Sequence, residues 1–163
     1  MGRVHYISCG DGPTVIFLHG IGSGAESFSH QLDAFATAGY QAVAWDMPGY
    51  GDSPPLDEVT FPALSNALAD LFDDLSLSTA HVVGHSIGGM VLQQFARTYQ
   101  DRLSCMVLAE TSPAFGSPDG DFQKQFVAAR LAPLKAGQTM AEVAEDVVPA
   151  LVGNGVAANS IAF

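Results

Sequence analysis

The chain has 163 residues, of which 48% are hydrophobic and 14% are charged, and this balance excludes an intrinsically disordered protein. The formal net charge is −11 with only six Lys and Arg residues, which argues against nucleic acid or an anionic membrane as a partner. No apolar run approaches the ~20 residues of a membrane-spanning helix and the amino terminus does not resemble a signal peptide, so we expect a cytoplasmic protein.

Apolar runs typical of strands alternate along the chain with segments of helical periodicity. The strand-like runs cover residues 4–8, 14–18, 40–45, 81–83 and 103–109. The helical patterns cover residues 25–38, 61–75 and the stretch that follows Ser86 as far as Tyr99. Strands that alternate with helices favour βαβ units, so we predict an α/β fold with a mostly parallel sheet flanked by helices.

The pattern changes after Ser112. A linker-like turn at residues 113–118 is followed by two short amphipathic helices, predicted at 122–134 and 140–151, with no further strand pattern. We therefore divide the chain into an α/β core, residues 1–112, and a helical segment, residues 113–163.

The stretch Gly84-His85-Ser86-Ile87-Gly88 has the spacing G-x-S-x-G between a predicted strand and a predicted helix. A serine at the tip of such a turn has a strained backbone, and glycine is favoured two residues to either side because the chain passes close to neighbouring backbone. Free N–H groups at the start of the helix favour negative charge developing there. The alternative is a turn in which Ser86 has only a local structural role, and the pentapeptide alone does not decide between the two.

Three glycine-rich loops follow predicted parallel strands, and their motifs together resemble those of the α/β-hydrolase family. The segment His19-Gly20-Ile21-Gly22 resembles its H-G-x-G loop, Asp46–Ser53 resembles its D-x-x-G-x-G-x-S loop, and Gly84–Gly88 resembles its nucleophile elbow. Within that family the chain is most similar to the 3-oxoadipate enol-lactonase and esterase-like members. The resemblance makes residues 1–112 the N-terminal part of an incomplete α/β-hydrolase core and residues 113–163 the beginning of a helical cap.

The resemblance implies a serine hydrolase that acts on a small carboxylic ester or lactone and needs no metal and no cofactor. Ser86 would be the nucleophile that forms an acyl-enzyme. The backbone N–H groups of Ile21 and Ile87 would form the oxyanion hole. A serine at position 86, rather than an aspartate, argues against the alkyl-enzyme route of epoxide hydrolases and haloalkane dehalogenases.

Three further residues are expected to line the substrate-binding site: His19, Gly20 and His85. His19 would brace the oxyanion loop, or else be a core histidine bonded to nearby backbone. His85 is expected to pack or line the site rather than to transfer protons.

A serine nucleophile needs a general base, and in this family the order along the chain is Ser, acid, His. Every histidine of the chain stands before Ser86: His5, His19, His30, His81 and His85. His5 and His81 begin predicted strands, which places both at the end of the sheet away from the reactive loops. Glu110, after the strand 103–109, is either the orienting acid or a loop carboxylate that lines the site.

We therefore expect the sequence to stop inside the cap, with the catalytic histidine and its acid elsewhere, and the 163 residues alone to be inactive. The run 103–109 would then be an uncovered edge strand through which the chain self-associates. A different class of function also fits, namely a non-catalytic ligand-binding protein or an inactive remnant of this fold.

Two smaller expectations concern the remaining polar residues. Asp46 and Asp52 are expected to fix their own loop by bonding its backbone N–H groups. Cys9 and Cys105, in apolar surroundings, are expected to be small core residues.

Overall fold

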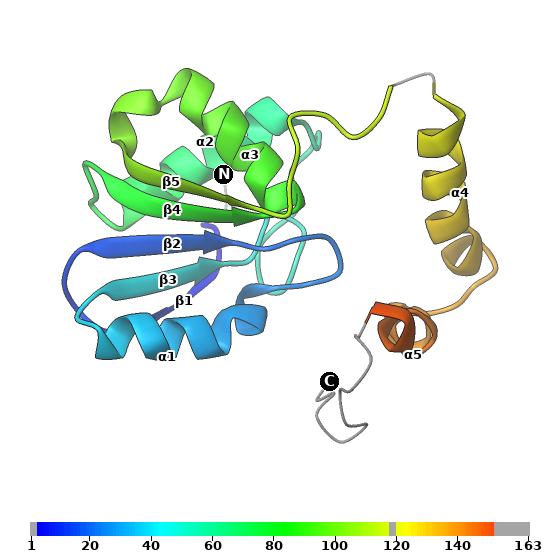
Figure 1. The fold of residues 1–163 in the computed structure, drawn as a ribbon, viewed down its shortest axis with the longest axis horizontal. Helices are drawn as coiled ribbons and strands as arrows, with labels where there is room; N and C mark the ends of the chain where they lie inside the picture. The colour runs from blue at the N-terminus through cyan, green and yellow to red at the C-terminus, as the bar shows by residue number, and fades with distance from the viewer. Residues whose placement is uncertain (1–2, 118–119, 152–163) are drawn as a thin grey trace. The chain divides into compact units, whose positions relative to one another are not determined.

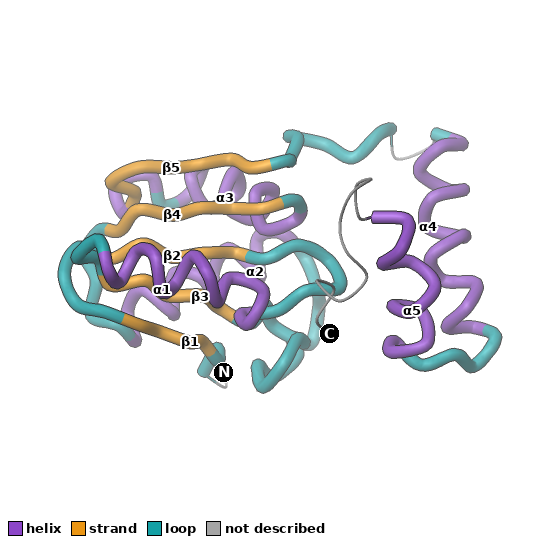
Figure 2. Tube along the Cα trace, turned by 60° about the horizontal axis from the view of Figure 1, so that its bottom comes forward, coloured by secondary structure: helices purple, strands orange, loops and turns teal. Residues whose placement is uncertain are grey.

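The computed structural model describes residues 3–117 and 120–151. They belong to two compact units that divide after Ala114. The first unit holds a five-stranded sheet made of β1 (Tyr6–Cys9), β2 (Thr14–Leu18), β3 (Gln41–Trp45), β4 (Ala80–His85) and β5 (Leu103–Ala109). The strands lie in the order β1-β3-β2-β4-β5, as Figure 2 shows, and only β1 is antiparallel to its neighbour. The predicted α/β fold with a mostly parallel sheet is confirmed.

Helices cover both faces of the sheet (Figure 1). One face carries α2 (Phe61–Asp74) and α3 (Ile87–Thr98), and the other carries α1 (Ser29–Thr37). The segment predicted as one helix over 25–38 begins with a 3₁₀ turn, η1 (Ala25–Phe28), before α1, and a second 3₁₀ turn, η2 (Gln100–Arg102), precedes β5. Helix α1 gives way to Gly39, whose φ of +86° suits a residue without a Cβ.

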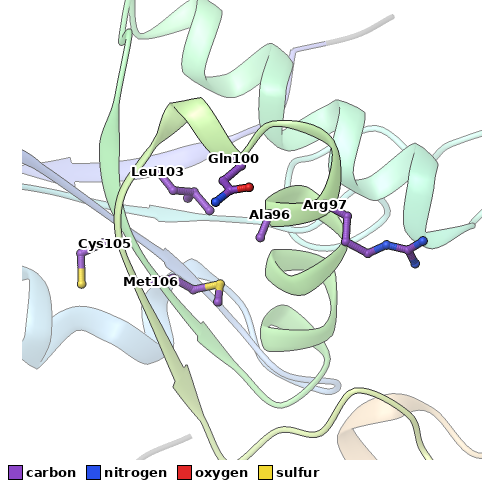
Figure 3. Close-up of a pocket in the computed structure, with 6 residues that line it drawn as sticks. All are labelled: Ala96, Arg97, Gln100, Leu103, Cys105 and Met106. Carbon is purple, nitrogen blue, oxygen red and sulfur yellow. The ribbon is translucent and has the colours of Figure 1, made fainter.

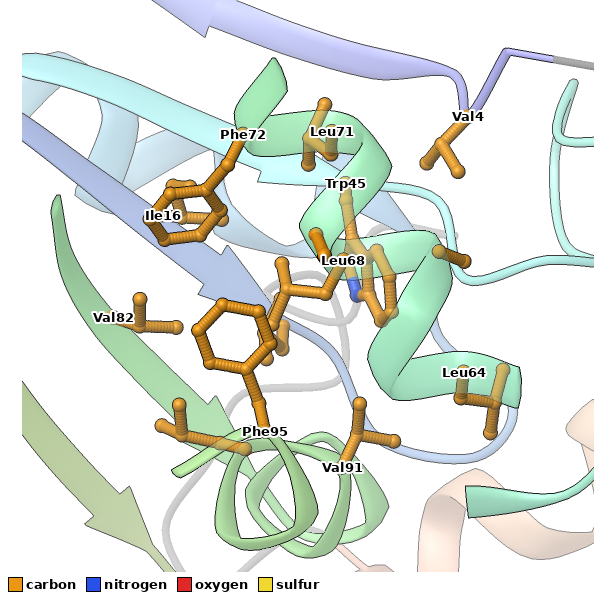
Figure 4. Packing of buried hydrophobic residues seen from close by; sticks show 14 of the residues in the cluster. Val4, Ile16, Trp45, Leu64, Leu68, Leu71, Phe72, Val82, Val91 and Phe95 are labelled. Carbon is orange, nitrogen blue, oxygen red and sulfur yellow. The ribbon is translucent and has the colours of Figure 1, made fainter. Parts of the chain in front are cut away.

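Two apolar layers sandwich the sheet, because neighbouring strand residues point to opposite faces. On β2, Ile16 and Leu18 belong to the larger cluster, with α2 and α3, while Val15 and Phe17 belong to the smaller one, with α1. Figure 4 shows the larger cluster, in which the fully buried Trp45 packs among side chains of the two helices. Burial on both faces explains why β2 and β3 have continuous apolar runs rather than alternating ones.

The edge strands overturn the prediction for the two cysteines. Cys9 lies on β1 and Cys105 on β5, and both side chains are exposed rather than buried in the core. Both strands are at an edge of the sheet, where an apolar sequence need not be covered on either face. On β5, Cys105 and Met106 leave the strand on opposite sides beside an open groove of ~530 Å³ against α3 (Figure 3).

The exposed β5 edge leads to a prediction about association. Met106, Val107 and Leu108 are 40–47% exposed, and the strand carries a row of unpaired backbone groups. We expect the 163-residue chain to self-associate by pairing through β5, and Val107→Lys to weaken that association at least about tenfold, because charge on an edge strand opposes pairing. Sedimentation equilibrium measures this, with Val59→Lys as the control because Val59 is exposed in a loop. A monomeric wild-type chain, or equal effects of the two variants, would contradict it.

The second unit contains α4 (Asp121–Lys135) and α5 (Met140–Leu151). Near the start of α4, Phe115, Phe122 and Phe126 lie against one another, with ring centroids 4.7–6.1 Å apart. The Arg130 guanidinium stacks on Phe126 at 3.6 Å from the ring centroid. The predicted helices of this segment are present, and its role as the start of a cap stays a prediction. Within residues 3–117 and 120–151, no helix has both the length and the apolar character needed to cross a membrane.

Candidate active site

The reactive loops meet at one edge of the sheet because the strands before them are parallel. The loops after β2, β3 and β4 begin at His19, Asp46 and Ser86. Ligands of open α/β sheets bind at this carboxyl edge. The three loops that carry the motifs therefore lie at the edge of the sheet where the sequence predicts them.

Ser86 stands alone between β4 and α3, at the tip of a sharp turn. Its φ is +53° and its ψ is −121°, a conformation that non-glycine residues rarely adopt. Strain of this kind persists only where the surrounding structure enforces it, and it gathers at functional sites. Ser86 as a whole residue is partly exposed.

Glycines make this turn possible by letting backbone approach backbone. A Cβ on Gly84 would lie 2.6 Å from the Cα of Gly89, and a Cβ on Gly88 would collide with the carbonyl oxygen of Leu18. Helix α3 thus starts directly against the end of β2. The close approach predicted on both sides of Ser86 is present at Gly84 and Gly88.

Two hydrogen bonds hold the elbow to the end of β5 and to the chain just after it. The Ser86 N–H donates to the carbonyl of Ala109 at 3.0 Å, and the Thr111 hydroxyl donates to the carbonyl of Ser86 at 2.6 Å. Gln93, on α3, also donates to the carbonyl of Ser112 at 3.2 Å. Thr111 is missed by sequence reasoning, because a bond between positions 25 residues apart leaves no local signal.

The loop that begins at Gly20 passes directly beside Ser86. A Cβ built on Gly20 would lie 3.2 Å from the Ser86 Cβ and 3.1 Å from His85 Nδ1. The Ile21 N–H donates no hydrogen bond within the described residues, and Ile87, as the first residue of α3, has no intrahelical acceptor. A role of these two amides as oxyanion donors stays a prediction.

His19 is fully buried and links two of the reactive loops. Its Nε2 accepts from the Met47 N–H at 2.9 Å, so the ring proton is on Nδ1, which donates to the Gly20 carbonyl at 2.7 Å. Burial lowers the pKa of His19, against smaller opposing effects of the Gly20 carbonyl and of Asp46. The two alternatives for His19, a brace for the Gly20 loop and a buried histidine bonded to nearby backbone, therefore describe the same set of contacts.

The lowered pKa of His19 predicts acid sensitivity. Protonation puts an N–H on Nε2, which faces the Met47 N–H, so the unfolded state takes up this proton more readily than the folded state. We expect the stability contributed by neutral His19 to be complete above about pH 6.5 and to fall below it, by at most about 1.4 kcal/mol per pH unit.

Urea unfolding between pH 5 and 8 measures this effect. His19→Gln keeps an acceptor near the Met47 N–H but does not titrate, so its stability is expected to depend less on pH. His30→Gln, on the exposed face of α1, is the control and should keep the wild-type dependence. Identical pH profiles for wild type and His19→Gln would contradict the prediction.

His85 and Glu110 face each other across the ends of β4 and β5. The distance from His85 Nε2 to Glu110 Oε2 is 3.6 Å, and Glu110 has a φ of +47°. Their side chains are 43% and 88% exposed, and a pair so open to solvent contributes little stability. A lining role for His85 and an acid role for Glu110 stay predictions.

His5 corrects one prediction about the site. Because β1 runs antiparallel to β3, the start of β1 lies at the carboxyl edge beside the reactive loops, not at the opposite edge. Its Nδ1 lies 2.7 Å from Asp46 Oδ2. Asp46 in turn accepts from the Ala25 N–H of the neighbouring loop, and the Asp52 carboxylate accepts no backbone bond within the described residues, so neither aspartate fixes its own loop as predicted.

Comparison with known proteins decides the family. The family model described as "alpha/beta hydrolase fold" matches residues 13–148. The chain belongs to the α/β-hydrolase family. The elbow at Ser86 and the loop at Gly20 are therefore features of an α/β-hydrolase core, as the motifs predict.

Relatives of this α/β-hydrolase carry several activities in their names. A 2-hydroxy-6-oxo-6-phenylhexa-2,4-dienoate hydrolase of Comamonas testosteroni is 37% identical over 110 residues, which are 64% of this chain and 38% of that protein. A bifunctional epoxide hydrolase 2 of Sus scrofa is 32% identical over 112 residues, 67% of this chain and 20% of that protein. The chain thus spans well under half the length of these curated relatives.

Solved structures give the same family. A thermophilic esterase from Thermogutta terrifontis superposes with a TM-score of 0.74 and 27% identity, covering 90% of this chain and 53% of that one. A bromoperoxidase from Bacillus anthracis superposes with a TM-score of 0.66 and 29% identity, covering 71% and 44%. These proteins share the α/β-hydrolase fold, but their names describe different reactions.

Proposed function

We propose that this α/β-hydrolase cleaves carboxylic ester or lactone bonds of a small molecule through an acyl-enzyme on Ser86. The observation that carries the proposal is the strained elbow, which places the Ser86 side chain beside the Gly20 loop. The similarity to an esterase structure supports the same class of reaction.

The chemistry follows from the groups at the elbow. The Ser86 oxygen attacks the acyl carbon, its proton passes to a general base, and the negative charge moves to the carbonyl oxygen. The N–H groups of Ile21 and Ile87 stabilise that oxyanion, and removing one such donor typically costs about 10²–10³-fold in rate. The C–O bond then breaks, the alcohol leaves with a proton, and water hydrolyses the acyl-enzyme.

In this family the histidine that acts as general base follows the nucleophile in the chain. All five histidines of this chain precede Ser86, so none of them stands at the position of the base. We assign the base to sequence outside the 163 residues, and the acid that orients it either to Glu110 or to that same outside sequence. The curated relatives are long enough to carry both, because the chain spans 38% and 20% of the two described above. The alternative function, ligand binding without turnover, is favoured by this same lack of a base.

A substrate comparison on the complete gene product tests the proposal. We expect p-nitrophenyl acetate and an enol-lactone to be hydrolysed, with an initial burst of one nitrophenolate per active site if deacylation is the slower step. Styrene oxide is included because epoxide hydrolases are among the relatives, and a serine nucleophile should leave it intact. Turnover of the epoxide without ester cleavage would overturn the proposal, and binding of these compounds without any turnover would favour the alternative.

A further inference from the structure

Three residues from two segments form a closed ring of hydrogen bonds at the carboxyl edge of the sheet. The His5 N–H donates to Ser53 Oγ at 2.8 Å, and the Ser53 hydroxyl donates to the Asp46 carbonyl at 2.6 Å. The Asp46 N–H donates back to the His5 carbonyl at 2.8 Å, which closes the ring. The side chains of the same two residues are also in contact, with His5 Nδ1 2.7 Å from Asp46 Oδ2. Asp46 and Ser53 are buried, so the bond between them is shielded from water, whereas the His5 side chain is 39% exposed.

The Asp46 carboxylate extends this ring to the loop that carries Ile21. One oxygen, Oδ2, faces His5 Nδ1, and the other, Oδ1, accepts from the Ala25 N–H at 2.8 Å. Glycines surround the carboxylate closely. A Cβ on Gly24 would lie 3.1 Å from Oδ1, and one on Gly51 would collide with Oδ2. Because each oxygen has a partner, the contact of Oδ2 with His5 helps to set the orientation of the Asp46 carboxylate.

The loop of residues 19–25 depends on such external anchors. Its three glycines give the backbone little stiffness of its own, and a Cβ built on Gly22 would have no atom within 4 Å in the described residues. The loop is bonded at its start by His19 to the Met47 N–H and at its end by Ala25 to Asp46. The Ile21 amide lies between these two anchors.

We propose that His5, acting through Asp46, is a positioning residue for the Ile21 amide. The inference rests on the proposed function, because that amide matters only if an oxyanion forms beside it. His5 holds Asp46 Oδ2, which aims Oδ1 at the Ala25 N–H and so fixes the end of the loop. An oxyanion donor must be held in place to stabilise charge, so loosening this anchor weakens turnover more than substrate binding.

The test compares two substitutions of His5 in the complete gene product. His5→Leu removes the bond to Asp46, whereas His5→Asn keeps an N–H near the position of Nδ1. We expect His5→Leu to lower kcat for p-nitrophenyl acetate about tenfold with KM nearly unchanged, a smaller loss than removal of a donor because the amide is displaced rather than deleted. His5→Asn is expected to recover most of kcat.

A second measurement does not depend on turnover. Hydrogen exchange of the Ala25 amide should accelerate in His5→Leu and stay near the wild-type rate in His5→Asn. Thr14→Val is the matched control, because it removes the 2.8 Å side-chain bond from Thr14 to Gln41 at the amino end of β2. It should change neither kcat nor Ala25 exchange.

The outcomes separate this inference from the proposed function. Equal kcat in His5→Leu and wild type, equal losses in His5→Leu and His5→Asn, or unchanged Ala25 exchange would overturn the role of His5 while ester turnover stands. Absence of ester turnover in the wild type is instead a failure of the proposed function, and it removes the catalytic role of His5 with it even if Ala25 exchange responds.

Discussion

Alanine at Gly88 is expected to destabilise the sheet-containing unit by about 3 kcal/mol. The added Cβ would collide with the Leu18 carbonyl oxygen and would lie 2.8 Å from that of His19. Both atoms belong to backbone, which cannot rotate away as a flexible side chain can. Helix α3 and the end of β2 must therefore separate, and the Gly20 loop would move with β2.

Urea unfolding of Gly88→Ala against wild type measures this loss. Gly39→Ala is the matched control, since Gly39 has a φ of +86° but a Cβ added to it would lie in open space. That variant should cost only about 1 kcal/mol, from backbone strain. A loss of stability in Gly88→Ala as small as that in Gly39→Ala would contradict the tight packing of α3 against β2 at Gly88.

Ser86→Ala is the second substitution with a large expected effect. It removes the attacking oxygen, so ester turnover by the complete gene product should fall by about 10³-fold or more. Stability should change little, because alanine and serine bear the same strain at a φ of +53°.

Ser76→Ala provides a close comparison for this variant. Ser76 also has a positive φ, +56°, but it is exposed at the end of α2. It should keep full activity with a similarly small change in stability. Ester turnover within tenfold of wild type in Ser86→Ala would show that another group is the nucleophile.

Much of the core could be predicted from the sequence because its signals are local. Continuous apolar runs identify β2 and β3 as strands buried on both faces, and the spacing of Gly84 and Gly88 around Ser86 predicts the elbow. Each signal lies within a few residues of the feature that it predicts. Each glycine-rich loop follows a predicted parallel strand. Because the carboxyl ends of parallel strands lie at the same edge of the sheet, the three loops are predicted to meet there.

The errors arise where distant segments decide the structure. An alternating pattern does not reveal strand direction, so the prediction for His5 names the wrong edge, because β1 is antiparallel to β3. Apolar neighbours do not reveal whether a strand lies at an edge, so the prediction of Cys9 and Cys105 in the core is wrong. Thr111, bonded to the carbonyl of a residue 25 positions away, gives no pattern at all.

A fluorophosphonate probe measures whether the bend between β4 and α3 makes the Ser86 hydroxyl a nucleophile. The Ser86 oxygen would displace fluoride from phosphorus, and mass spectrometry of the digested, labelled protein locates the adduct. We predict one phosphonyl group per folded chain of the complete gene product, on Ser86, and none in Ser86→Ala. A folded protein that stays unlabelled, or that carries the adduct at another residue, would contradict the role of Ser86 as the nucleophile.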